Sequence, residues 1–154
     1  MTTTDECNWV ECGPQLLAIS EAIVQQAQIS KRIIAMFDIV YAWLPHSGLR
    51  QTGHNYAIYQ PTPAGVLMRV GFPISEPFDD TAAVKCITLI AGRAVHTAHF
   101  GEYSGLRAAY QRLQAWCAQQ SVDSNGKISW EVYGDPHHDP SKNRTDIYIL
   151  VEPA

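Results

Sequence analysis

The fold of this chain is decided by the stretch IIAMFDIVYAWL at residues 33–44, because residues 106–117, LRAAYQRLQAWC, repeat its apolar pattern. The apolar positions of the two stretches are, in order, Ile33, Phe37, Val40, Trp43 and Leu44, and Leu106, Tyr110, Leu113, Trp116 and Cys117. Residues at this spacing lie on one side of an α-helix. Both stretches are therefore predicted to be amphipathic helices, with Trp43 and Trp116 in equivalent core positions.

The ends of both predicted helices are marked by residues that favour caps and turns. Ser30 is expected to cap the start of the first helix, and Pro45 with Gly48 is expected to end it. Ser104 is expected to cap the second helix, which should end before the turn-forming residues 121–126.

Each predicted helix is preceded by one extended segment and followed by two, which are joined as a hairpin. The extended segments are residues 16–24, 55–60 and 66–72 in the first half, and 93–100, 129–134 and 146–151 in the second. A proline-rich connection lies within each hairpin, at residues 61–65 and 135–140. A strand-helix-strand-strand (SHS2) unit is therefore predicted to occur twice.

This order of elements predicts an α+β fold with pseudo-twofold symmetry, in which an antiparallel sheet carries the helices on one face. We expect residues 1–154 to form a single domain, with repeat one at about residues 12–74 and repeat two at about residues 84–153. Residues 75–81 would link the two repeats. Each half alone would bury only a thin core.

Composition limits the classes of function. With 46% hydrophobic and 17% charged residues the chain should be globular, and its net charge of −4 argues against direct nucleic-acid binding. No apolar run is long enough to span a bilayer, and the polar start resembles no signal peptide, so we expect a cytoplasmic protein without a membrane partner. Four cysteines without a CxxC pair fit a reducing compartment.

Glu131 is the first candidate for a functional residue. On an extended strand, Trp130 shares one face with Ile128 and Val132, and we expect this apolar face to meet the helices. Glu131 and Tyr133 would then lie on the opposite face. If the two halves curve around a cleft, this face would suit a cationic or hydrogen-bonding organic ligand; otherwise Glu131 is a solvent-facing carboxylate.

The histidines predict no metal site. His96 and His99 are three residues apart on an extended segment and should point to opposite faces, while His137 and His138 fall in a polar loop. The sequence also lacks GxSxG, P-loop and GxGxxG motifs. We therefore expect neither a metal nor an organic cofactor.

Several short motifs resemble one known family. They are HFGEYSGL at residues 99–106, AW at 115–116, WEVY at 130–133, DP at 135–136 and TDIYI at 145–149. In this order they resemble the GyrI-like (gyrase-inhibitor-like) small-molecule-binding domain, from about residue 12 to residue 153. The same family supplies effector-binding domains of some AraC-type and MerR-type multidrug-responsive regulators.

The resemblance implies a ligand cleft between the two halves. In the family an acidic residue of the WExY strand meets cationic, aromatic ligands, and it corresponds to Glu131. The other residues that the resemblance assigns to ligand binding are Trp130, Tyr133 and Tyr148 in the second half, and Tyr59, Phe72 and Met68 in the first. The chain departs from the family at Leu150, where a proline is usual, and residues 24–29 lack the Gly-x-Tyr of the second half.

Three functions follow from the resemblance. The first is a stand-alone binding protein for amphipathic, cationic aromatic compounds, since the repeats leave no room for a DNA-binding segment. The second is a hydrolase of strained-ring cytotoxic compounds, with Glu131 as general base and Tyr133 or Trp130 orienting the substrate. The third is a protein-interaction module that modulates DNA gyrase.

Overall fold

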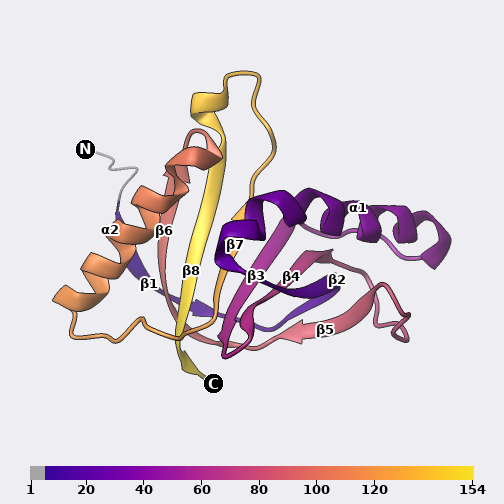
Figure 1. The fold of residues 1–154 in the computed structure, drawn as a ribbon, viewed down its shortest axis with the longest axis horizontal. Helices are drawn as coiled ribbons and strands as arrows, with labels where there is room; N and C mark the ends of the chain where they lie inside the picture. The colour runs from indigo at the N-terminus through magenta and orange to yellow at the C-terminus, as the bar shows by residue number, and fades with distance from the viewer. Residues whose placement is uncertain (1–5) are drawn as a thin grey trace. The chain divides into compact units, whose positions relative to one another are not determined.

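The computed structural model describes residues 6–154, and these residues divide into two compact units (Figure 1). The central unit is Pro14–Ile90. The terminal unit combines residues up to Gly13 with Ala91–Ala154. Each unit contains four antiparallel strands and one helix, as the α+β prediction requires.

The central unit consists of β2 (Gln15–Val24), α1 (Ile29–Ser47), β3 (Asn55–Thr62), β4 (Gly65–Pro73) and β5 (Lys85–Leu89). Its strands pair in the order β3-β4-β2-β5. Helix α1 packs on β2 and β4. The core between them contains Ala18, Val40 and Phe72, with Trp43 and Phe78 at its margin.

The terminal unit consists of β1 (Cys7–Cys12), β6 (Gly92–Phe100), α2 (Leu106–Gln119), β7 (Ser129–Tyr133) and β8 (Arg144–Pro153). Its strands pair in the order β1-β6-β8-β7. The core below α2 is built from Val95, Leu113, Cys117, Ile147 and Ile149. Cys117 is fully buried, so it packs as a small hydrophobic residue as predicted.

The repeated strand-helix-strand-strand unit is confirmed, because β2-α1-β3-β4 and β6-α2-β7-β8 have the same pairing. Two further strands were not predicted. Strand β1 precedes β2 in the chain but pairs with β6, and β5 precedes β6 but pairs with β2. The chain therefore crosses between the units at residues 13–14 and again at residues 90–91.

The predicted helix ends need correction. Both helices begin after a short 3-10 turn, Gln26–Gln28 or Tyr103–Gly105, so neither Ser30 nor Ser104 is a capping residue. Pro45 does not end α1, because it lies in the last turn and its missing N–H removes only one hydrogen bond. The helix ends at Ser47, and Gly48 follows with φ of +74°, a left-handed conformation that glycine adopts readily.

The two tryptophans occupy equivalent positions on their helices. At the 73-residue offset of the sequence repeat, Met36 matches Ala109 and Val40 matches Leu113, and all four side chains are buried. Trp43 and Trp116 are both partly buried, and each packs against the core of its own unit. The repeated apolar pattern therefore identified the helix faces and their alignment correctly.

Candidate functional site

Strand β7 presents Glu131 and Tyr133 to helix α2, which corrects the predicted orientation of this strand. The hydroxyl of Tyr110 on α2 donates to Glu131 Oε2 at 2.6 Å. In addition, Glu131 pairs across the sheet with Ile147, a member of the core below α2. Directly opposed residues share a face of the sheet, so Trp130 points to the face away from α2.

Glu131 is held by phenols on both carboxylate oxygens. Its side chain is only 5% exposed, so the alternative of a solvent-facing carboxylate is wrong. Tyr110 donates to Oε2, and Tyr133 donates to Oε1 at 2.5 Å. The ring of Tyr103 makes an edge contact with Tyr133 at 5.7 Å between centroids. We call Glu131, Tyr110 and Tyr133 the Glu131 cluster.

The Glu131 cluster joins a buried acid to aromatic rings. A buried carboxylate needs hydrogen-bond donors, and the two phenols provide them. The same combination of a negative charge and ring faces attracts organic cations. From the sequence, Tyr110 was identified only as one of the apolar positions of its helix. The signal that was missed is its hydroxyl, a polar group on the helix face that packs against the strand carrying Glu131.

The structure predicts a measurable role for Tyr133 in stability. Tyr133→Phe keeps the ring but removes one donor to Glu131, so we expect the free energy of unfolding to fall by about 1–3 kcal/mol. Urea unfolding followed by circular dichroism measures this change. Tyr103→Phe is the matched control because Tyr103 is 60% exposed, and a loss as large for Tyr103→Phe would contradict the assignment.

The face of the terminal sheet away from α2 carries other predicted site residues. Trp130 and Tyr148 stack with their rings 5.2 Å apart, and His96 lies 4.8 Å from Tyr148. Trp130 is 3% exposed. The structure therefore brings Trp130 and Tyr148 together with His96, not with Glu131 and Tyr133, so the predicted set of ligand-binding residues is divided between two faces.

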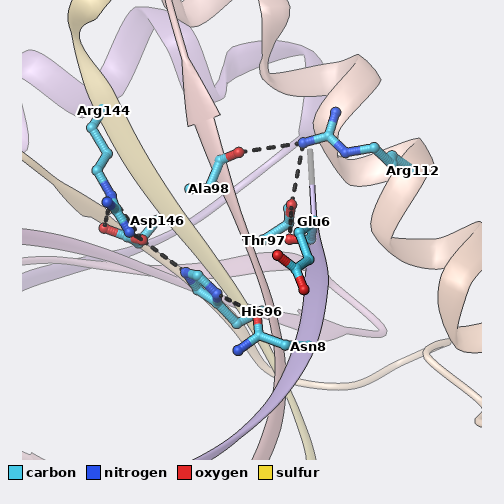
Figure 2. Close-up of polar contacts among 8 residues, drawn as sticks. All are labelled: Glu6, Asn8, His96, Thr97, Ala98, Arg112, Arg144 and Asp146. Atoms are coloured by element: carbon cyan, nitrogen blue, oxygen red, sulfur yellow. Dashed lines mark hydrogen bonds and ion pairs between the residues drawn. The ribbon is translucent and has the colours of Figure 1, made fainter. Parts of the chain in front are cut away.

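His96 joins three strands on this second face. Its Nε2 donates to Asp146 Oδ1 at 2.7 Å, and its Nδ1 lies 2.9 Å from Asn8 Oδ1. Arg144 donates to both oxygens of Asp146. Figure 2 shows His96 between Asn8 and Asp146, while Arg112 of α2 reaches Thr97 and Ala98 separately. The group ties β1, β6 and β8 to one another through side chains.

Burial by itself raises the pKa of Asp146, but the hydrogen bonds from His96 and Arg144 outweigh it and hold the pKa below its usual value. A carboxyl with a lowered folded-state pKa stabilises the protein above the unfolded pKa of about 3.9. That contribution is lost as the pH falls through the folded-state value.

Acid unfolding tests the role of Asp146. We expect the unfolding free energy of the wild type to decline more steeply below about pH 4 than that of Asp146→Asn, which has no carboxyl to protonate. Denaturant titrations from pH 7 to pH 2.5 measure the difference. Parallel curves for the two proteins would show that this carboxyl does not couple stability to pH.

The predicted first-half residues belong to the central unit. Met68 and Phe72 are fully buried, Phe72 packs in the core, and its ring lies 4.9 Å from that of Tyr41. Tyr59 is half-buried and opposes Met68 in the register of β3 and β4. All three share the face covered by α1, and their part in ligand binding stays a prediction.

Three other features of residues 6–154 bear on function: the loop histidines, possible metal ligands and the character of the helices. His137 and His138 stack on each other at 4.3 Å in an exposed loop. Within residues 6–154, no three histidine, cysteine, aspartate or glutamate side chains gather as a metal site would require. Neither α1 nor α2 is long and apolar enough to cross a membrane.

Solved structures with the same fold include a C-terminal domain, a protein bound to tetraphenylphosphonium and a hydrolase. The C-terminal domain of EcmrR matches with a TM-score of 0.81 at 19% identity, over 97% of this chain and 98% of that domain. SAV2435 bound to tetraphenylphosphonium matches with a TM-score of 0.72 at 14% identity, over 96% of this chain and 94% of that chain. The hydrolase encoded by lin2189 from Listeria innocua matches with a TM-score of 0.61 at 11% identity, over 96% of this chain and 92% of that chain. At these identities the likeness establishes the fold.

Family comparison agrees with the resemblance found in the sequence motifs. No curated protein sequence matches the chain. The model of the GyrI-like small molecule binding domain matches residues 26–152, which include both helices and the Glu131 cluster. The chain therefore belongs to the GyrI-like small-molecule-binding domain family.

Proposed function

We propose that this chain binds amphipathic, cationic aromatic compounds through the Glu131 cluster. The observation that carries the proposal is the buried Glu131 carboxylate, held on both oxygens by phenols. A buried carboxylate that lies beside aromatic rings offers an organic cation both a negative charge and ring surfaces. An organic cation would supply the opposite charge.

Aromatic side chains around the acid support the ligand class. Tyr110, Tyr133 and Tyr103 present rings as well as hydroxyls on the α2 side of the sheet. Rings favour flat, apolar ligand surfaces, and their faces attract cations. The likeness to SAV2435 bound to tetraphenylphosphonium, an aromatic cation, supports the same class.

Calorimetry with a charged and a neutral probe tests this function. Tetraphenylphosphonium should bind the purified protein, and neutral triphenylphosphine oxide should bind more weakly, because only the phosphonium offers a charge to Glu131. Equal affinities for both probes, or no binding of the phosphonium, would contradict the proposal.

Hydrolysis of strained-ring compounds is the second candidate, and the likeness to the Listeria innocua hydrolase favours it. Glu131 would act as general base on water, with Tyr133 as its hydrogen-bonded neighbour. Trp130, the other residue expected to orient the substrate, lies on the opposite face of the sheet from Glu131. Incubation with a strained-ring electrophile followed by mass spectrometry tests for the ring-opened product.

A further inference from the structure

Three polar side chains form a row across the terminal sheet next to Glu131. Tyr133 on β7 pairs with Thr145 on β8, and Thr145 pairs with His99 on β6. Side chains that are directly opposed in neighbouring strands lie beside each other on the same face. This row, which we call the polar row, therefore faces α2, as the Glu131 cluster does.

Thr145 in the centre of the polar row has an unsatisfied hydroxyl. The residue is 1% exposed, and its Oγ1 has no hydrogen-bond partner among residues 6–154. The adjacent Thr97 of β6 is equally buried on the same face, but its hydroxyl is bonded to Glu6 and Arg112. Leaving a buried hydroxyl unpaired is costly, so proteins rarely do it without a function.

His99, at the end of the polar row, uses one of its two ring nitrogens in a hydrogen bond with the described residues. Its Nε2 donates to the carbonyl oxygen of Glu102 at 2.8 Å, so in the neutral ring Nδ1 is an acceptor. In the described part of the chain, Nδ1 has no hydrogen-bond partner of its own. Gly105 packs against the ring so closely that an added Cβ would lie 2.6 Å from Cε1, which holds the imidazole in place.

We propose that Thr145 and His99 form a subsite that recognises a hydroxyl group on the ligand of the Glu131 cluster. Thr145 Oγ1 would donate to the oxygen of that hydroxyl, and the hydroxyl would donate to His99 Nδ1. This inference rests on the proposed function and narrows its ligands to aromatic cations that carry a hydroxyl. One ligand molecule can reach both Glu131 and Thr145. The two residues are diagonal neighbours in paired strands, and such neighbours lie about 7–8 Å apart.

A matched pair of probes tests the subsite. Tetraphenylphosphonium and (4-hydroxyphenyl)triphenylphosphonium differ only in one hydroxyl. The wild type should bind the hydroxylated probe more tightly, with each of the two neutral hydrogen bonds contributing about 2–12-fold. Thr145→Val keeps the shape and removes one of these hydrogen bonds, so it should lower the ratio of the two affinities by about 2–12-fold.

Two control variants and one stability measurement complete the design. Thr145→Ser retains the hydroxyl, and Thr97→Val makes the same change in the neighbouring row; both should keep the ratio of the wild type. In the free protein, Thr145→Val should raise the midpoint of thermal unfolding by about 2–4 °C, because an unpaired polar group leaves the interior. A lower midpoint would overturn the premise.

The outcomes separate this inference from the proposed function. If the wild type binds both phosphonium probes equally, or if Thr145→Val keeps the full preference of the wild type, the hydroxyl subsite is wrong while the cation site stands. If the wild type binds neither probe, the cation site and the subsite are both wrong. A preference that falls in Thr145→Val but not in the two control variants supports the subsite.

Discussion

We expect the replacement of Glu131 with glutamine to lower the affinity for tetraphenylphosphonium by about 10–150-fold. Glutamine keeps the length and shape of the side chain but removes its charge. An aromatic cation close to a buried carboxylate gains about 1.5–3 kcal/mol from that charge, which converts to this change in the dissociation constant. Isothermal titration calorimetry on wild type and Glu131→Gln measures the loss directly.

Neutral triphenylphosphine oxide is the control ligand for this variant, and it should lose much less affinity. Should both ligands weaken equally, Glu131 shapes the site but does not recognise charge. The same variant distinguishes binding from hydrolysis. If Glu131 is a general base, Glu131→Gln should leave substrate affinity nearly intact and lower turnover by about 10²–10⁴-fold.

We expect the replacement of Leu113 with alanine to lower the free energy of unfolding by about 2–5 kcal/mol. Leu113 is fully buried at the centre of the core below α2, where it packs with Val95, Cys117 and Ile147. Truncation removes apolar contacts and leaves a cavity that the surrounding sheet can only partly fill. Urea unfolding followed by circular dichroism measures the change.

Gln114→Ala is the matched control for this variant, since the neighbouring Gln114 is exposed on the same helix. We expect that substitution to change the unfolding free energy by no more than about 0.5 kcal/mol. If Leu113→Ala costs less than about 1 kcal/mol, the assignment of the core below α2 is wrong.

Local periodicity was sufficient to predict the repeated architecture. Apolar residues at helical spacing identified α1 and α2, and extended segments around each helix, two of them joined as a hairpin, identified β2, β3, β4, β6, β7 and β8. These patterns depend on which face of one element is buried, a property that neighbouring residues encode. The strand carrying Glu131, and the opposite orientation of His96 and His99, were predictable for the same reason.

The direction in which β7 faces was not predictable. Alternation separates Trp130 from Glu131, but both side chains are buried, so hydrophobicity does not say which one meets the helix. The partner that decides is Tyr110, whose hydroxyl lets an apolar helix face accept a carboxylate. Such a match between distant residues leaves no periodic signal in the chain.

Strand pairing likewise required the tertiary structure. Strand β1 pairs with β6 rather than with β2, its neighbour in sequence, and the repeats therefore exchange their first strands. The same long-range pairing places Thr145 between Tyr133 and His99. The contacts of the whole sheet determine the register. Which residues meet across the sheet therefore depends on the tertiary fold, whereas which residues form each strand depends on the local sequence.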